Sequence, residues 1–322
     1  MTSLTEFEAK PRASQRIRFS EWLDAMPHPS VVLEIAATHV AAARWGRDIA
    51  HLTASAVERL PDGVIVPSTT QTNINDQGAV RAAIRRVVSE VPSQGQPVAL
   101  MVPDPVIRVF ILSFDNFPRR NEEALPMLRW RLKKSLPFDA EEAAISWMRQ
   151  ANREGKPEVV AAVARQKIIR EYESVAEQEG IAVGVVQSST LATLPMLDRE
   201  LSTLLVRMSG RNLTTVIARG DTLCVYRSTE MDKGPEGVTS QSILDEVFPA
   251  IAFYQDTWGG KIDCVKVTGF GAGEEALRLE VAREIGCPAE ALSMTKDLPP
   301  EARSLVAKRL EALVGWHLNL GA

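Results

Sequence analysis

Short apolar runs follow one another in the same order in two parts of this chain, and this repetition constrains the fold more than any other feature. We expect strands at residues 31–36, 40–45 and 49–60, and again at residues 204–208, 214–218 and 223–227. Gly220 and Asp221 supply a turn between the last two runs. Residues 34–36 align weakly with residues 207–209. An internal duplication of this kind predicts a two-lobed α/β fold.

Further strands and several amphipathic helices are predicted between and after these runs. Buried strands are expected at residues 97–102 and 106–114, and a further strand at residues 264–268. Helices are expected at residues 77–91, 166–180, 240–257, 274–285 and 302–316. Val80, Ile84 and Val87 form the apolar face of the first of these helices, and Gly286 closes the fourth.

One more helix combines an apolar face with a cationic end. Asn121 is placed to cap it, and Glu122 and Glu123 suit its first turn. Four leucines share its apolar face, namely Leu125, Leu128, Leu132 and Leu136. Four basic residues gather toward its end, namely Arg129, Arg131, Lys133 and Lys134. Pro137 stops the helix, and its basic face is either a solvated surface or a contact for an acidic partner or anionic lipid.

Composition sets broad limits on function. The chain has 322 residues and 45% hydrophobic content, enough for two domains or one bilobed domain. Its net charge of −4 and pI near 5.8 argue against nucleic-acid binding through bulk charge. No apolar stretch is long enough to span a bilayer, and the N-terminus lacks a signal-peptide core. We expect a cytoplasmic protein that reaches a membrane only through a partner.

Cysteines and histidines give no sign of a metal site. The three cysteines, Cys224, Cys264 and Cys287, are widely spaced, as in proteins of reducing compartments. The four histidines show no ligand spacing and are His28, His39, His51 and His317. A P-loop and a nucleophile elbow are also missing from the sequence. We therefore predict no metal ligands and no catalytic residues.

Three segments together resemble PilM, the actin-like protein family of type IV pilus assembly machines. They are residues 130–147, which begin Trp130-Arg131-Leu132-Lys133-Lys134, residues 159–197 and residues 243–272. Their order and spacing agree with this family over roughly the whole chain after Pro29. The resemblance extends through PilM to FtsA, sugar kinases, Hsp70 and actin. It implies an α/β, actin-like (ribonuclease H-like) fold of two lobes with a small inserted α/β subdomain.

The resemblance also implies how the chain is divided. Residues 1–28, with one short helix at residues 19–26, are expected to form a mobile N-terminal extension. The first lobe takes residues 29–103 and 185–202, the inserted subdomain residues 104–184, and the second lobe residues 203–322.

Actin-like ATPases hold their nucleotide between the lobes with two Asp-x-Gly loops and a glycine-rich turn. The first loop here contains Glu34, Ala36, Thr38 and His39. PilM relatives usually carry Asp at position 34, Gly at position 36 and Lys at position 41. The carboxylate of Glu34 reaches one methylene further than that of Asp, and Mg²⁺ tolerates misplaced ligands poorly.

The other two loops are also altered. Arg207 replaces the acid of the second loop and Ser209 its glycine, with Gly210 following. A guanidinium can bind phosphate but cannot hold a metal ion or act as a base. The third loop keeps Gly269 and Gly271 around Phe270, whose ring either stacks on a base or fills the cleft. These positions predict a degenerate site in which ATP binding is possible and hydrolysis is not expected.

The resemblance implies a scaffold at the inner face of the bacterial inner membrane. Its partner is expected to be the N-terminal cytoplasmic tail of a PilN-like single-span protein, held in a groove between the first lobe and the inserted subdomain. Residues 106–114 and the helix at residues 125–136 are candidate walls of this groove. A pilus motor ATPase and further copies of the chain, in a ring or another oligomer, are also implied partners. Two alternatives remain open: an active actin-like ATPase with a nucleotide-driven switch, and a GspL-like type II secretion component.

Overall fold

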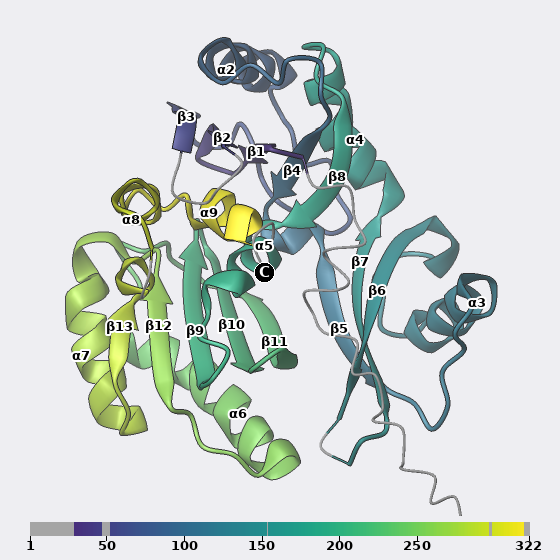
Figure 1. Ribbon diagram of the computed structural model, residues 1–322, viewed down its shortest axis with the longest axis vertical. Helices are drawn as coiled ribbons and strands as arrows, with labels where there is room; N and C mark the ends of the chain where they lie inside the picture. The colour runs from purple at the N-terminus through teal and green to yellow at the C-terminus, as the bar shows by residue number, and fades with distance from the viewer. Residues whose placement is uncertain (1–28, 47–51, 153, 296–297, 319–322) are drawn as a thin grey trace, which may run out of the picture.

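The computed structural model describes residues 29–46, 52–152, 154–295 and 298–318, which form three β-sheets and the helices around them (Figure 1). The extension predicted at residues 1–28 lies outside the described residues, as does the start of the strand predicted at residues 49–60. Within the described ranges, no helix is both long and apolar enough to cross a membrane.

The first lobe is built on a five-stranded sheet of order β3-β2-β1-β4-β8. Its strands are β1 (Val31–Ile35), β2 (His39–Trp45), β3 (Leu52–Arg59), β4 (Val98–Val102) and β8 (Val183–Ser188). β1 pairs antiparallel with β2 and parallel with β4. Two helices, α2 (Gln77–Glu90) and α4 (Gln166–Glu177), share one apolar core with this sheet. Val80, Ile84 and Val87 of α2 are buried there, so the predicted apolar face is confirmed.

The second lobe repeats this arrangement in a sheet of order β11-β10-β9-β12-β13. Its strands are β9 (Ser202–Ser209), β10 (Asn212–Arg219), β11 (Thr222–Glu230), β12 (Cys264–Thr268) and β13 (Ala289–Ala291). β9 pairs antiparallel with β10 and parallel with β12, as β1 does with β2 and β4. The outer face packs on α6 (Ser240–Trp258) and α7 (Glu274–Ile285). The predicted internal duplication is therefore confirmed.

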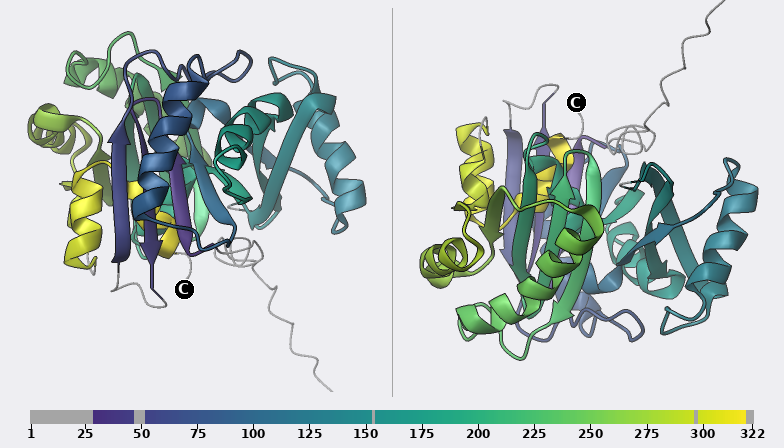
Figure 2. Two further views of the ribbon diagram at one scale, coloured as in Figure 1. Left: turned by 90° about the horizontal axis from the view of Figure 1, so that it is seen from above. Right: turned by 90° about the horizontal axis from the view of Figure 1, so that it is seen from below.

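A shared apolar core joins the two large sheets. Three short helices, α5 (Ser189–Thr193), α8 (Pro300–Ala307) and α9 (Glu311–Leu318), contribute to it (Figures 1 and 2). Met101 of the first sheet, Leu205 of the second and Trp316 of α9 are all buried in this interlobe core. Gly315 lets α9 approach α5, because a Cβ at this position would lie 2.2 Å from the carbonyl oxygen of Ala192. The two lobes are thus packed on one another along α9.

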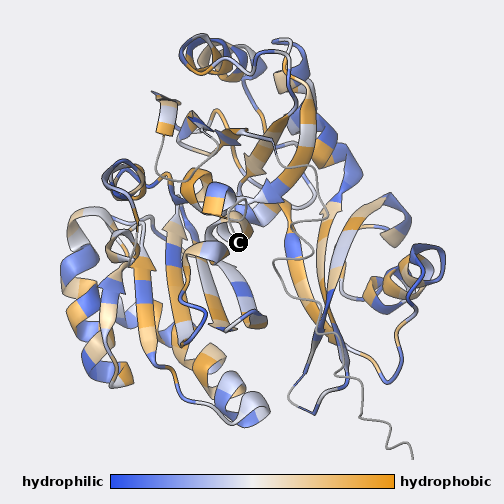
Figure 3. Ribbon diagram, viewed as in Figure 1, coloured by the Kyte–Doolittle hydropathy of each residue, from blue (hydrophilic) through white to orange (hydrophobic). Residues whose placement is uncertain are grey.

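A third sheet of order β5-β7-β6 forms the inserted subdomain at one side of the molecule (Figures 1 and 2). Its antiparallel strands are β5 (Arg108–Ser113), β6 (Ala143–Ala151) and β7 (Pro157–Arg165). Alternate residues of a strand point to opposite faces. Val159 and Val163 of β7 therefore pack with α3 (Asn121–Leu132), whereas Val160 joins the interlobe core. In Figure 3 the strands are mainly hydrophobic, whereas α3 and α7 show both colours.

Short 3-10 turns complete the described elements. They are η1 (Asp104–Val106), η2 (Ala140–Glu142), η3 (Leu194–Met196), η4 (Gly271–Gly273) and η5 (Leu292–Met294). The first of them corrects a prediction, because the buried strand expected at residues 106–114 is divided between η1 and β5. β5 itself is only half-buried, since one of its edges pairs with no other strand of the described chain.

Other helices also differ from the predictions in their extent or in the lobe to which they belong. Asn121 is the first residue of α3 rather than its cap, which is Arg120 and makes no side-chain hydrogen bond. α3 ends at Leu132, and only a turn continues to Leu136. The helix expected at residues 302–316 is split into α8 and α9, because Arg309 adopts φ 64° between them. α4 lies within the span assigned to the inserted subdomain, but its buried side chains belong to the first-lobe core.

Candidate functional site between the two lobes

Glu34 and Arg207 occupy equivalent positions near the ends of the central strands of the two large sheets. Because alternate residues share a face of a strand, Glu34 lies on the same face of β1 as Val32, and Arg207 on the same face of β9 as Leu205. Val32 and Leu205 belong to the interlobe core. Both charged side chains therefore point between the lobes, where Glu34 is 1% and Arg207 3% exposed.

The guanidinium of Arg207 is held by two buried carboxylates. Its Nε donates to Glu311 Oε1 at 2.6 Å, and its Nη1 donates to Asp104 Oδ2 at 3.1 Å. Nη1 also lies 3.2 Å from the hydroxyl of Thr190. Glu311 is the first residue of α9, and Asp104 is the first residue of η1, directly after β4. Arg207 therefore connects the second lobe to the first lobe and to the C-terminal helix.

Asp104 is the centre of a hydroxyl network. Its Oδ1 accepts from the backbone N–H of Thr190 at 2.9 Å, and its Oδ2 accepts from the hydroxyls of Thr190 at 2.5 Å and Thr214 at 3.0 Å. The hydroxyl of Tyr226 lies 3.5 Å from Oδ1, and burial together with the charge of Asp104 raises its pKa well above the ordinary value. An ionised carboxylate offers about four acceptor sites. Asp104 has none left for a further ligand.

Glu34 is held by a hydroxyl and a histidine. It accepts from Ser189 Oγ at 2.6 Å, and its Oε2 lies 3.7 Å from His39 Nε2. Burial raises the pKa of Glu34, but nearby His39, the charge of Arg207 and the hydrogen bond from Ser189 outweigh burial and lower it below its ordinary value. Glu34 is therefore a carboxylate at neutral pH.

Arg207, Glu34, Asp104 and Glu311 together form what we call the interlobe charge cluster. Burial acts against the charge of Arg207, but Glu311, Asp104 and Glu34 raise the pKa of its guanidinium above the ordinary value. In the described part of the chain, Oε2 of Glu34 and Oε2 of Glu311 are buried without a hydrogen bond. Three carboxylates thus surround one guanidinium, and its loss would leave them uncompensated.

The glycine-rich turn does not complete this cluster as a nucleotide cradle. Phe270 is 3% exposed and packs in the second-lobe core, so its ring neither fills the interlobe cleft nor lies open for a base. A Cβ on Gly269 would lie 1.9 Å from the carbonyl oxygen of Met208, and one on Gly271 would lie 2.5 Å from Arg309 Nη2. Gly269 therefore serves close packing of the turn against the backbone of β9, whereas Gly271 meets only the flexible end of the Arg309 side chain.

A cavity of about 640 Å³ opens beside the cluster. Residues from the first lobe, the inserted subdomain and the second lobe line it, among them Val66, Asp104, Val109, Phe110 and Tyr226. Of the ten positions predicted from the sequence, Thr38, Ser209 and Gly210 line this cavity. The other seven, Glu34, Ala36, His39, Arg207, Gly269, Phe270 and Gly271, are not among its lining residues.

A metal-bound nucleotide does not fit the interlobe charge cluster. Mg²⁺ prefers a tight octahedron of oxygen ligands, whereas Asp104 and Glu311 are bonded to Arg207, and Asp104 and Glu34 to hydroxyl groups. A guanidinium supplies positive charge at this place but cannot coordinate a metal. Among the residues that the structure describes, no group of three or more His, Cys, Asp and Glu side chains could hold a metal ion.

The sequence reasoning identified Glu34 and Arg207 but missed Asp104, Glu311 and Thr190. A signal for Glu311 does exist, because it is the only acid in the otherwise apolar start of α9, and buried charges need a partner. Asp104 follows the fully apolar strand β4, where a lone acid is equally conspicuous. Nothing local to either acid points to Arg207, which is 103 residues from Asp104 and 104 from Glu311.

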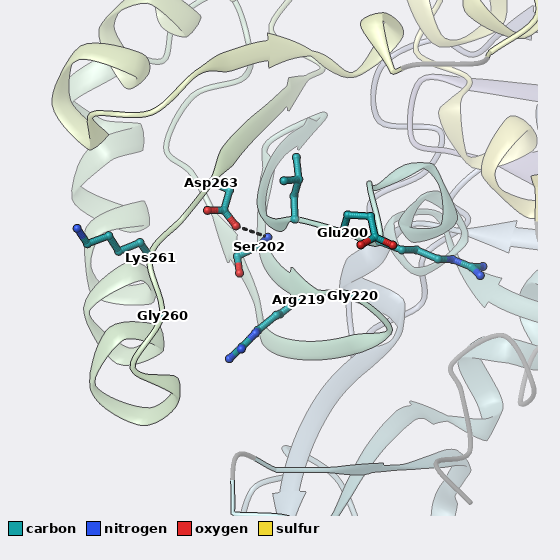
Figure 4. A pocket seen from close by; sticks show the side chains of 9 residues that line it. Glu200, Ser202, Arg219, Gly220, Gly260, Lys261 and Asp263 are labelled. Carbon is teal, nitrogen blue, oxygen red and sulfur yellow. Dashed lines mark hydrogen bonds between the residues drawn. The ribbon is translucent and has the colours of Figure 1, made fainter.

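A second hollow lies at the opposite ends of the second-lobe strands (Figure 4). Arg219 and Lys261 line it, but in Figure 4 the charged ends of their side chains lie apart from one another. Asp263, an acid that also lines the hollow, accepts a hydrogen bond from the backbone N–H of Ser202 at 2.8 Å. The cations do not converge, and we assign no ligand to this hollow.

No family model and no curated protein sequence matches this chain. Among solved structures, a chain of the PilM–PilN type IV pilus biogenesis complex is 15% identical, with a TM-score of 0.74, and the match covers 92% of this chain and 100% of that chain. The cytoplasmic domain of EpsL, an inner membrane component of the type II secretion system of Vibrio cholerae, is 12% identical, with a TM-score of 0.48 and coverage of 74% and 80%. A protein with an actin-like ATPase fold from Bacteroides thetaiotaomicron is 11% identical, with a TM-score of 0.46 and coverage of 89% and 96%.

The match to the PilM–PilN structure concerns the fold. It extends over 92% of this chain, which includes both large sheets and the third sheet. The predicted two-lobed actin-like α/β fold is confirmed, and the resemblance to PilM holds for the whole fold.

Proposed function

We propose that this chain, which shares its actin-like fold with the PilM–PilN complex, is a scaffold protein of a type IV pilus machine. In this proposal it binds an extended segment of a PilN-like inner-membrane protein, reaches the membrane through that partner, and does not hydrolyse ATP. The fold match supports the class of machine. The observation that carries the proposal is the buried pairing of Arg207 with Glu311 and Asp104, because it fills the place where an actin-like ATPase needs an acid and a metal ion.

The cavity beside the cluster suits an extended peptide. Its volume of about 640 Å³ lies within the roughly 300–1,000 Å³ usual for ligand pockets. One wall is apolar and includes Ile65 and Val66, and Val66 is 52% exposed. Val109 and Phe110 of β5 also line the cavity. Apolar side chains of a bound segment would be removed from water against these residues.

β5 adds backbone groups to the same cavity. It is an edge strand of the third sheet and pairs only with β7 in the described part of the chain. An exposed edge can accept an additional strand through main-chain hydrogen bonds, while side-chain pockets select the sequence. Arg108, whose guanidinium carbon lies 5.5 Å from the ring centre of Phe110, adds a positive charge at this edge.

A charge placed on the apolar wall is expected to weaken partner binding. The probe is a synthetic peptide with the N-terminal cytoplasmic sequence of the PilN-like protein encoded in the same genome, and its affinity is measured by fluorescence anisotropy. Val66→Asp is expected to reduce affinity at least about tenfold, since it buries an unpaired carboxylate against the peptide.

Val57→Asp is the matched control for this measurement. Val57 is 50% exposed, close to the 52% of Val66, but lies on β3 away from the cavity. Its variant is expected to bind the peptide as the unmodified chain does. Equal affinity of the Val66→Asp variant, or an equal loss in both variants, would place the peptide elsewhere.

We expect no Mg²⁺-dependent binding of ATP to this protein. Calorimetric titration of the unmodified protein with millimolar ATP, in the presence and absence of Mg²⁺, measures this directly. We expect no Mg²⁺-dependent heat, because Arg207 already engages Asp104 and Glu311. A saturable, Mg²⁺-dependent signal with ATP turnover would favour the alternative of a nucleotide-driven switch.

A further inference from the structure

Three aromatic side chains in the described ranges are 40% exposed or more. Trp130 on α3 is 78% exposed, whereas Phe253 and Phe248 on α6 are 55% and 40% exposed. Asp245 and Asp256, which are also exposed, lie on the same helix as the two phenylalanines. Trp130 has basic neighbours instead. The surface around Trp130 therefore differs in charge from the other exposed aromatic surface of this protein.

The end of α3 and the turn after it place cations close to Trp130 in the chain. Lys133 is the residue that caps the end of α3 and Lys134 lies in the turn that follows, three and four residues after Trp130. Arg131 lies beside it, and all three cations are exposed. Leu128 and Leu132, two residues to either side, point the opposite way into the subdomain core. We call Trp130, Arg131, Lys133 and Lys134 the Trp130 patch.

The acids near this patch leave its cations available. Glu141 pairs with Arg129 at 3.6 Å, and Glu142 pairs with Arg165 at 2.7 Å. Glu122 and Glu123 lie in the first turn of α3, at its other end. Within the described part of the chain, no ion pair involves any of the three patch cations. Three unpaired positive charges therefore surround one exposed indole ring.

We propose that the Trp130 patch contacts the anionic headgroups of a phospholipid bilayer. Indole rings concentrate at the boundary between headgroups and acyl chains, where their polar and apolar parts are both accommodated. Lysine and arginine close to an anionic membrane surface each add attraction. Acidic residues around Phe248 and Phe253 would be repelled by the same surface, which distinguishes the two exposed aromatic sites.

The position of the patch allows such a contact. α3 lies on the outer side of the third sheet, at the edge of the molecule in Figure 1 and in both views of Figure 2. One small anchor gives only weak, reversible binding, so the patch would act as a second attachment beside a protein partner. The lipid contact itself does not depend on the proposed peptide groove. With a net charge of −4, the chain as a whole is repelled by anionic lipid, and binding requires a local patch.

Vesicle flotation with the full chain tests this proposal. Vesicles of equal phosphatidylglycerol and phosphatidylcholine are compared with vesicles of phosphatidylcholine alone, at low and high salt. We expect binding to the anionic vesicles only, and weaker binding at high salt. The variant R131Q/K133Q/K134Q is expected to lower partitioning by roughly 100-fold, at about fivefold for each cation removed.

Two single variants separate the aromatic contribution from general stickiness. Trp130→Ala leaves all the charges in place and is expected to lower vesicle partitioning several-fold. Phe253→Ala, on α6, is expected to leave vesicle partitioning unchanged. Circular dichroism confirms that each variant is folded, as expected for exposed positions. The proposal is overturned if the chain does not bind anionic vesicles, or if the triple variant binds them as well as the unmodified chain. Either result would leave an acidic protein, rather than lipid, as the ligand of the Trp130 patch. None of these measurements uses the peptide, so they stand apart from the test of the groove.

Discussion

Replacing Arg207 by methionine is expected to lower the free energy of unfolding by about 3–5 kcal/mol, the usual effect of removing one partner from a buried ion pair. Methionine has a similar reach but donates no hydrogen bond. It would leave Glu34, Asp104 and Glu311 buried without their common cation. Urea denaturation followed by circular dichroism measures the change. Arg207→Lys keeps the positive charge but not the two-pronged hydrogen-bonding geometry. Its free energy of unfolding is expected to lie between those of the unmodified chain and the Arg207→Met variant.

Arg211→Met is the control for this substitution. Arg211 lies in the turn between β9 and β10, its side chain is 57% exposed, and it contacts Glu230 at 3.3 Å. Its replacement is expected to change stability by no more than about 0.5 kcal/mol. Similar losses in both variants would mean that the interlobe charge cluster has no special role in holding the lobes together.

The effect of Arg207→Met is also expected to depend on pH. In the unmodified chain the pKa of folded Glu34 is lowered from 4.5, so its contribution to stability is present above that value and is lost as pH falls. In the variant the charge of Arg207 no longer favours the ionised form, and burial still opposes it. Protonation of Glu34 at low pH then removes an uncompensated buried charge from the variant, whereas in the unmodified chain it removes a favourable interaction with Arg207. The stability difference should be largest near neutral pH and shrink below about pH 4.5.

Replacing Gly269 by alanine is expected to lower the free energy of unfolding by about 2–6 kcal/mol. About 1–3 kcal/mol comes from backbone strain at φ 96°. A further part of about 1–3 kcal/mol comes from overlap, since the new Cβ would lie 1.9 Å from the carbonyl oxygen of Met208, in the neighbouring strand β9. Thermal or urea denaturation without nucleotide measures this loss.

Gly273→Ala is the matched control, four residues further along. Gly273 has φ −81°, and a Cβ there would meet nothing within 4 Å. Its replacement is expected to change stability by less than about 1 kcal/mol in either direction. This pair tests whether the glycine-rich turn is retained for packing. If Gly269→Ala were as mild as Gly273→Ala, close packing would not explain Gly269, and a ligand-binding role for the turn would regain weight.

The sequence predicted the elements of the fold well where periodicity is strong. β12 and α7 match the predicted residues 264–268 and 274–285, and both large sheets show the predicted repetition. Predictions were weaker where local signals compete. The leucine spacing of α3 suggested a helix to Leu136, yet the helix ends at Leu132. The apolar run at residues 302–316 did not indicate that Arg309 would turn the chain between α8 and α9.

What the sequence by itself determined is therefore local: strand and helix periodicity, the duplicated order, and the presence of single charged residues, Glu34 and Arg207, in otherwise apolar strands. What only the tertiary structure decided is which distant groups meet. Asp104 and Glu311 reach Arg207 because η1 and α9 are brought to the end of β9 by packing of the interlobe core, across more than 100 residues of chain. Periodicity reports which face of an element is apolar, since burial acts on each element separately. The partner of a buried charge depends on the relative placement of whole elements, and no local pattern carries that information.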